Sequence, residues 1–137
     1  MVNYVFYDDT DCGGIVYHSN YITFCERARS LIFFENNMHP HRNTEGFVVK
    51  SIESEFITPL KFADKYKVRT ILLELKHTSI VMQQQIFKIG SVTGQDKDSI
   101  LTFSAKIKLA YIDLTLKKPC KIPENMRELL SKFFIES

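Results

Sequence analysis

Three carboxylates, two adjacent glycines and a histidine lie close together near the start of the chain: Asp8, Asp9, Asp11, Gly13, Gly14 and His18. Adjacent glycines suit a tight turn because they adopt backbone conformations that other residues resist. A carboxylate presented by such a turn can attack a carbonyl carbon, or it can deprotonate a water molecule that does so. Acyl chemistry needs a carboxylate near free backbone amides, and this stretch is able to supply both. We expect Asp11 to be the reactive carboxylate and to be buried, because burial strengthens a carboxylate as a base. The alternative is that the aspartates only form the turn.

The amides would come from a helix that begins just after His18. Apolar residues recur there at steps of three and four, which predicts a helix over about residues 20–36. Ser19 or Asn20 can cap its start, and the pair at 36–37 followed by Pro40 marks its end. The first N–H groups of a helix have no partner within it, so they can polarise a carbonyl oxygen.

Alternation of apolar and polar residues predicts four strands after this helix: Phe47–Thr58, Lys65–Lys76, Ser79–Ile89 and Ile100–Ile112. The last is the clearest, with the odd-numbered residues 101–111 on one face and Lys106 and Lys108 on the other. The faces of Phe47–Thr58 cannot be assigned, and a bulge or a subunit interface would explain its broken alternation.

The remaining segments complete one predicted domain over residues 1–137. They are a first apolar strand (Val2–Tyr7), a polar hairpin loop (Gly90–Asp98), a basic linker (Leu114–Ile122) and a last helix that Pro123 opens, with Phe133 and Phe134 in its apolar stripe. A strand, a long helix and four antiparallel strands indicate an α+β fold, and the lack of βαβ alternation argues against a doubly wound nucleotide-binding fold.

Composition excludes several classes of protein. The net charge of +2, without a basic stripe, argues against nucleic-acid binding. No apolar run is long enough to span a bilayer, and the first residues do not resemble a signal peptide. The cysteines are odd in number and lack metal-ligand spacing: Cys12, Cys25 and Cys120. They predict reduced thiols in the cytoplasm. His39 and His41 alone are a weak metal signal, so we expect no metal site.

A dozen or more positions share the order and spacing of a known signature: Tyr7, Asp9-Thr10-Asp11, Gly13-Gly14, Val16-Tyr17-His18, Asn20-Tyr21, Phe24 and Glu26-Arg27-Ala28-Arg29. This signature resembles that of the YbgC-like branch of the 4-hydroxybenzoyl-CoA thioesterase family. The resemblance continues more weakly through Pro59, Asp64 and Thr78-Ser79. It implies the hotdog fold, in which a curled five-stranded antiparallel sheet surrounds a long central helix, and it implies acyl-CoA thioesterase activity.

The resemblance also implies roles for particular residues. Asp11 matches the catalytic aspartate, as nucleophile or general base, and His18 and Tyr7 would assist it. Tyr17, Lys76, Thr78 and Ser79 would contact the substrate, although Lys76-His77 replaces the usual Arg-Gly pair. Glu26 is a second-choice base, because a helix glutamate is catalytic in other hotdog branches. Cys12 is an alternative nucleophile that more simply stands in for a small residue.

The family implies a homo-oligomer, a dimer or a pair of dimers, with active sites at the subunit interface and no cofactor beyond the coenzyme A of the substrate. Two other functions remain open for this fold. One is an enoyl-thioester hydratase or dehydratase, and the other is an acyl-CoA-binding protein without activity.

Overall fold

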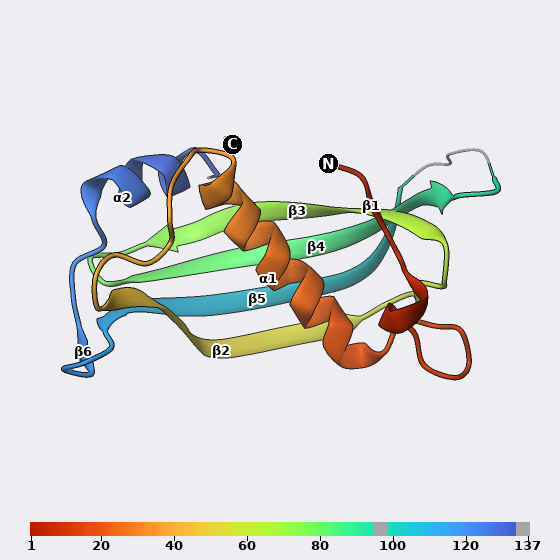
Figure 1. The fold of residues 1–137 in the computed structure, drawn as a ribbon, viewed down its shortest axis with the longest axis horizontal. Coiled ribbons are helices and arrows are strands. Elements are labelled where there is room, and N and C mark those ends of the chain that lie inside the picture. Colours follow the sequence, from red (N-terminus) through yellow and green to blue (C-terminus); the bar gives the residue numbers. More distant parts are fainter. Residues whose placement is uncertain (95–98, 134–137) are drawn as a thin grey trace. The chain divides into compact units, whose positions relative to one another are not determined.

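The computed structural model describes residues 1–94 and 99–133, and the strands in this part of the chain form one sheet (Figure 1). The strands are β1 (Asn3–Tyr4), β2 (Glu45–Phe56), β3 (Asp64–Leu75), β4 (Ser79–Ser91), β5 (Ile100–Asp113) and β6 (Lys118–Pro119). The helices are the short 3₁₀ helix η1 (Tyr7–Asp9), α1 (His18–Phe34) and α2 (Glu124–Ser131). The sheet order is β1-β3-β4-β5-β2, with β6 paired to β5. The predicted α+β class with a five-stranded antiparallel sheet, a long helix and a C-terminal helix is confirmed, and β6 is an addition.

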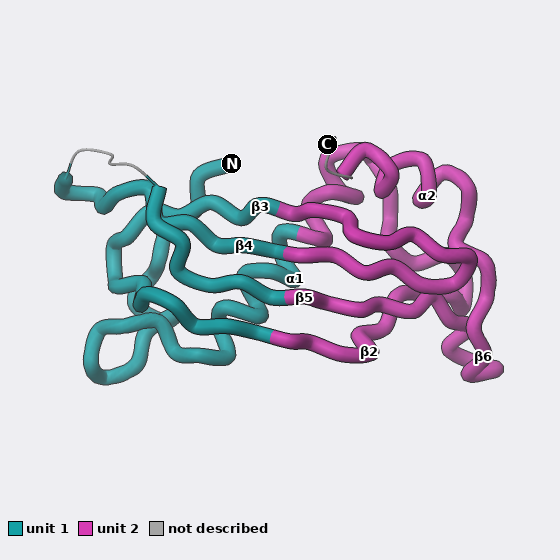
Figure 2. The backbone as a smooth tube through the Cα atoms, turned by 180° about the vertical axis from the view of Figure 1, so that it is seen from behind, with its two compact units in different colours: residues 1–28, 54–69, 84–105 teal, residues 29–53, 70–83, 106–137 magenta. Residues whose placement is uncertain are grey.

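The chain divides into two compact units (Figure 2). Unit 1 contains Met1–Ala28, Ser54–Arg69 and Gln84–Ala105, and unit 2 contains the remaining segments. Helix α1 and strands β2 to β5 each contribute one part to each unit. The prediction of a single domain over residues 1–137 stays a prediction.

In unit 1, the first half of α1 packs its apolar stripe on the sheet. The Phe24 ring stacks on Tyr66 of β3 at 4.7 Å, and the Tyr21 ring stacks on Phe103 of β5 at 5.2 Å. The fully buried Gln84 of β4 donates from Nε2 to the Cys25 carbonyl at 3.0 Å. A buried amide that is hydrogen-bonded in this way fixes the position of the helix on the sheet.

In unit 2, the second half of α1 meets an aromatic cluster. The Phe33 ring lies 6.1 Å from that of Phe47, which in turn makes an edge contact with Tyr111 at 4.9 Å. Helix α2 buries Met126, Leu129 and Leu130, as its predicted stripe requires. Phe133 follows the helix, and its carbonyl accepts from the Leu72 N–H at 2.8 Å; Phe134 lies outside the described residues.

Helix α1 begins and ends about two residues earlier than the predicted range of 20–36. The Asn20 side chain does not cap the helix; its Nδ2 donates to the Asp9 carbonyl at 2.8 Å, and the Asn20 N–H donates to the Tyr17 carbonyl at 2.9 Å. At the other end Asn37 has a left-handed φ of 55°, and the Met38 N–H returns to the Phe33 carbonyl. That pattern terminates a helix without a glycine.

The predicted linker 114–122 contains a turn and a strand. The Asp113 carboxylate accepts from the Leu116 and Thr115 N–H groups, which lowers its pKa, and the chain reverses there so that Lys118–Pro119 pairs with the end of β5. In the predicted loop 90–98, β4 continues to Ser91, and residues 95–98 lie outside the described part.

Strand β5 has the predicted faces over most of its length. Phe103, Ile107 and Tyr111 are buried, and Lys106 and Lys108 are exposed. Thr102 is an exception, since it is buried and its hydroxyl donates to the Ile86 carbonyl. Strand β2 is the last strand in the sheet order, and its position at the edge explains why most of its residues are not buried.

A buried ion pair anchors the start of β3 in unit 1. The Asp64 side chain is only 5% exposed, and its Oδ1 lies 3.3 Å from Lys88 Nζ. Its Oδ2 accepts from the Lys61 N–H at 2.8 Å, so the carboxylate also closes the turn that precedes the strand. A buried charge is tolerated only when it is paired in this way.

Removing the cation should therefore destabilise the protein. We expect Lys88→Met to lower the free energy of unfolding by about 2 kcal/mol, below the range for a fully buried pair because Lys88 is partly exposed and Asp64 keeps one hydrogen bond. Urea denaturation measures this value. Lys67→Met, at an exposed position of β3, is the control and should change it by less than about 0.5 kcal/mol. Equal effects of the two substitutions would contradict the assigned role.

Candidate active site

The residues Thr10 to Val16 form a tight turn around Asp11. The Asp11 N–H donates to the Ile15 carbonyl at 2.9 Å, and the Gly14 N–H donates to the Asp11 carbonyl at 3.1 Å. Gly14 has a left-handed φ of 80°, which a side chain would strain. The Gly13 N–H donates to Asp11 Oδ1 at 2.8 Å. As predicted, the two glycines form the turn, and this turn presents Asp11.

Backbone pairing holds this turn against the segment that precedes β3. The Val16 N–H donates to the Leu60 carbonyl at 2.9 Å, and the Phe62 N–H donates to the Gly14 carbonyl at 3.1 Å. Ile15 and Lys61 form a bridge between these two bonds. The residues just before Leu60 are thereby fixed beside the turn.

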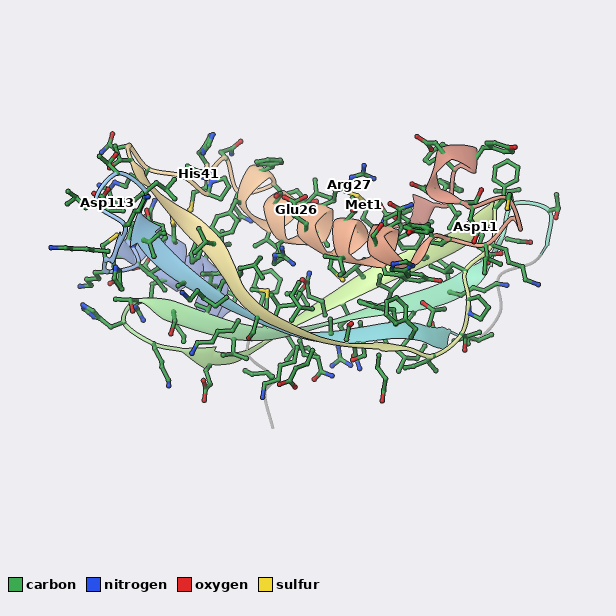
Figure 3. All side chains as sticks on the ribbon, turned by 90° about the horizontal axis from the view of Figure 1, so that it is seen from below. Met1, Asp11, Glu26, Arg27, His41 and Asp113 are labelled. Carbon is green, nitrogen blue, oxygen red and sulfur yellow. The ribbon has the colours of Figure 1, made fainter. Side chains whose placement is uncertain are left out.

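A pocket of about 350 Å³ opens between the turn, the start of α1 and the end of β2. All of its lining residues belong to unit 1: Asp11, Ile15, Val16, Tyr17, His18, Tyr21, Phe56, Ile57, Thr58 and Pro59. Figure 3 shows Asp11 beside the first turn of α1. The pocket combines a mostly apolar wall with a few polar groups, which is the usual character of a small-molecule site.

The predicted burial of Asp11 is wrong, because its side chain is exposed. Oδ1 is held by the Gly13 N–H, and Oδ2 has no hydrogen-bond partner among the described residues. The carboxylate is therefore fixed by one oxygen and leaves the other available to a ligand or a water molecule. The like-charged Asp9 does not share this position, since its own carboxylate accepts from the Phe6 N–H.

The start of α1 supplies the backbone donors. His18 is the first residue of the helix, and its N–H and that of Ser19 have no hydrogen-bond partner within residues 1–94 and 99–133. The Asp9 carbonyl accepts from the Tyr17 N–H at 3.1 Å and from Asn20, and these bonds fix the helix start. Free N–H groups at this end carry partial positive charge and attract a developing oxyanion.

The His18 and Tyr17 side chains border the pocket together. Their rings lie 4.3 Å apart, and the His18 ring makes an edge contact with Phe56 at 6.5 Å. Both residues are exposed, so the imidazole is accessible to a bound molecule.

Two predicted residues do not line the pocket. Tyr7 is 79% exposed and packs its ring on Phe62 at 5.7 Å. Glu26 is exposed on α1, farther along the helix from Asp11 (Figure 3). Their catalytic roles stay predictions without a contact to this pocket.

The predicted substrate-binding residues Lys76, Thr78 and Ser79 belong to unit 2, at the turn between β3 and β4. The Lys76 N–H donates to the Ser79 carbonyl, and the Thr78 carbonyl accepts from the Tyr111 N–H, each at 2.8 Å. They are not among the pocket residues, and their roles also stay predictions.

Sequence reasoning did not identify the aromatic wall of the pocket, which Tyr21 and Phe56 form. Tyr21 Oη accepts from the Leu60 N–H at 3.0 Å, and burial raises the pKa of this hydroxyl although that bond opposes the shift. Phe56 ends the one strand whose faces could not be assigned from the sequence, so no signal marked it as part of a site.

The other candidate groups do not line this pocket. No cluster of three or more histidine, cysteine or acidic residues able to hold a metal occurs in the described part of the chain. The rings of His39 and His41 lie 5.7 Å apart in unit 2, and both residues are exposed. No helix in the described residues is long and apolar enough to cross a bilayer.

The family model of the thioesterase-like superfamily matches residues 5–130, and the chain therefore belongs to that superfamily. This match confirms the predicted class of enzyme, a thioester hydrolase.

Among its relatives are the proteins named acyl-CoA thioesterase YbgC from Helicobacter pylori strain J99 and from Haemophilus influenzae. The first is 36% identical, with 93% of this chain and 96% of the relative covered; the second is 30% identical, with 90% and 87% covered. A solved gentisyl-coenzyme A thioesterase has a TM-score of 0.76 at 25% identity, over 95% of this chain and 98% of that chain. The predicted YbgC-like resemblance and the hotdog fold are confirmed.

The Tyr21 hydroxyl provides a test of how the pocket is held. Tyr21→Phe keeps the ring but leaves the buried Leu60 N–H without an acceptor, so we expect the free energy of unfolding to fall by about 1–3 kcal/mol. Tyr66→Phe is the matched control, because Tyr66 is equally buried in the same unit and accepts no backbone N–H. Urea denaturation measures both losses of stability. If the loss for Tyr21→Phe is no larger than that of the control, the hydrogen bond between Tyr21 and Leu60 does not hold the segment that precedes β3.

Proposed function

We propose that this protein is an acyl-CoA thioesterase, which hydrolyses an acyl-CoA to a carboxylic acid and free coenzyme A. One observation carries the proposal: Asp11 and His18, whose backbone N–H has no partner in the described part of the chain, line one pocket. The names of the Helicobacter and Haemophilus relatives support the same activity.

The backbone donors would act on the thioester carbonyl. With its oxygen against the His18 and Ser19 N–H groups, the carbonyl carbon becomes more electrophilic, and the negative charge that develops on oxygen is stabilised. One such donor contributes roughly 10²–10³ in rate. Because the N–H groups belong to the helix backbone, they are already oriented before the substrate binds.

Asp11 would supply the attacking oxygen in one of two ways. Oδ2 can attack the carbonyl carbon and expel the coenzyme A thiolate, which takes up a proton; water then hydrolyses the mixed anhydride and regenerates the carboxylate. Alternatively, Oδ2 accepts a proton from a water molecule as that water attacks, and the thiolate leaves with the proton. Both routes give the same products and need no metal or redox cofactor.

The remaining predicted residues have secondary places in this proposal. The His18 imidazole would orient the water molecule or the leaving thiolate, and Tyr17 would contact the substrate beside it. Lys76, Thr78 and Ser79 would contact coenzyme A in a homo-oligomer with interfacial sites, as the family resemblance suggests. Tyr7 and Glu26 do not line the pocket, and their catalytic roles stay predictions. The cytoplasmic location is a prediction from the cysteine content.

Asp11→Asn tests the catalytic role directly. Asparagine keeps an oxygen that can accept the Gly13 N–H, but it can neither attack nor take up a proton. We expect the rate of thiol release from a panel of acyl-CoAs to fall roughly 10²–10⁴-fold. The thermal unfolding temperature and the oligomeric state should not change.

Cys12→Ser is the matched control, because Cys12 is the neighbouring exposed nucleophile and does not line the pocket. It should retain wild-type turnover. Full activity in Asp11→Asn, or loss of activity in Cys12→Ser alone, would show that the Asp11 carboxylate is not the reactive group. Water addition to an enoyl-CoA without thiol release would indicate a hydratase, and binding without turnover would indicate an acyl-CoA-binding protein.

A further inference from the structure

We infer that Arg127, on the C-terminal helix α2, is a positioning residue for substrate binding: it holds the turn of residues 76–79, between β3 and β4, in the shape that binds coenzyme A. This inference rests on the proposed function, in which Lys76, Thr78 and Ser79 contact the coenzyme A part of the substrate. It gives α2 a part in binding although no residue of this helix lines the pocket. The helix and the turn both belong to unit 2.

The guanidinium group of Arg127 donates to two carbonyls of the turn. Its Nη2 lies 2.9 Å from the Lys76 carbonyl oxygen and 3.1 Å from the His77 carbonyl oxygen. Both hydrogen bonds have a charged donor, which makes them stronger than bonds between neutral groups. They join residues that are 51 and 50 positions apart in the chain, so they fix the turn to a distant element.

Helix α2 is a firm base for this side chain, because its apolar stripe is buried. Ile122, just before the helix, is fully buried, and its N–H donates to the His77 carbonyl at 3.0 Å. The His77 carbonyl therefore accepts from the backbone before α2 and from Arg127 on α2. The turn cannot shift relative to the helix without losing these bonds.

Every carbonyl of the turn is hydrogen-bonded. The Thr78 carbonyl accepts from the Tyr111 N–H, and the Ser79 carbonyl accepts from the Lys76 N–H, each at 2.8 Å. The other two carbonyls are those that Arg127 holds. Connecting turns at a protein surface are ordinarily more mobile than the strands they join. This turn is fixed along its whole backbone, which a hairpin connection alone does not need.

The side chains of the turn are left available to a ligand. The hydroxyls of Thr78 and Ser79 are half-buried, and neither has a hydrogen-bond partner within residues 1–94 and 99–133. Lys76 and His77 are exposed, and the Lys76 ammonium only reaches Glu74 at 4.0 Å. Hydroxyls beside an ammonium group suit the amides and phosphates of coenzyme A. Because hydroxyls on short side chains have little reach, the backbone position decides whether they meet the ligand.

Arg127→Met tests this role, because it removes the donors and keeps a stem of similar thickness. We expect the Kd for free coenzyme A, measured by titration calorimetry, to rise about 10-fold or more. For the acyl-CoA that the wild type hydrolyses fastest, KM should rise by a similar factor while kcat stays within about twofold. Arg127→Lys keeps a charged donor without the planar fork, so it should regain part of the lost affinity.

A truncated substrate separates positioning from a general loss of structure. The N-acetylcysteamine thioester of the same acyl group lacks the pantothenate and nucleotide parts of coenzyme A. In Arg127→Met its kcat/KM should stay within about twofold of the wild-type value, because the lost contacts are not made by this substrate. A merely structural role would lower kcat/KM equally for both thioesters.

Lys132→Met is the matched control, because it removes a positive charge from the end of the same helix. Lys132 is exposed, and its side chain makes no hydrogen bond or ion pair in the described part of the chain. This variant should keep the wild-type values. An Arg127→Met variant with wild-type affinity for coenzyme A, or with equal losses on both thioesters, would overturn the inference while leaving the thioesterase activity intact.

Thr78→Val keeps the inference testable if Arg127→Met does not fold. It leaves the Arg127 bonds in place and removes one hydroxyl of the turn, so it should also weaken coenzyme A binding; unchanged affinity would overturn the inference. A wild type that binds coenzyme A but hydrolyses no acyl-CoA would contradict the proposed function and leave the turn as a binding site. A wild type that neither binds nor hydrolyses would overturn both.

Discussion

The hydrogen bonds of Leu60 hold the candidate active site together. Its N–H donates to Tyr21 on α1, and its carbonyl accepts from Val16 at the end of the acidic turn. This single buried residue thus connects helix α1, the acidic turn and the segment before Leu60 that lines the pocket. Because backbone groups buried away from water must be paired, this arrangement is determined by the same requirement that stabilises the fold.

The position of the reactive groups follows from that constraint. The turn is closed by Gly14 in a left-handed conformation, and the Gly13 N–H orients one oxygen of the Asp11 carboxylate. The Asp9 carbonyl fixes the first turn of α1, which leaves the His18 N–H without a partner. The donors and the carboxylate are both attached to backbone that is hydrogen-bonded elsewhere, so neither has to reorganise when a substrate binds.

The aromatic core has two functions in unit 1. Tyr21 and Phe103 are buried side chains that pack α1 on the sheet, and Tyr21 with Phe56 also bounds the pocket. Substitutions in this cluster are therefore expected to affect both the packing of α1 and the shape of the pocket.

Local patterns predicted the parts of the structure that depend on near neighbours. The glycine turn around Asp11, the long helix and the buried face of β5 follow from residue types a few positions apart, and each is present. The observed helix begins two residues before the predicted range, because the Asn20 side chain donates to the Asp9 carbonyl, eleven residues away, instead of capping the helix. The turn after Asp113 was missed because residues 114–122 were interpreted as a linker. The hydrogen bonds that the Asp113 carboxylate accepts form this turn.

The sequence by itself determined the family, the α+β class and the acidic turn with its candidate carboxylate, because these are encoded in the types and spacing of adjacent residues. Only the tertiary structure decided that Tyr21 and Phe56 bound the pocket and that Tyr7 and Glu26 lie outside it. The Tyr21 hydroxyl meets a backbone group 39 residues away, and the exposure of Asp11 depends on which segments pack around the turn. Contacts over such separations result from packing of the whole chain, and local periodicity carries no record of them.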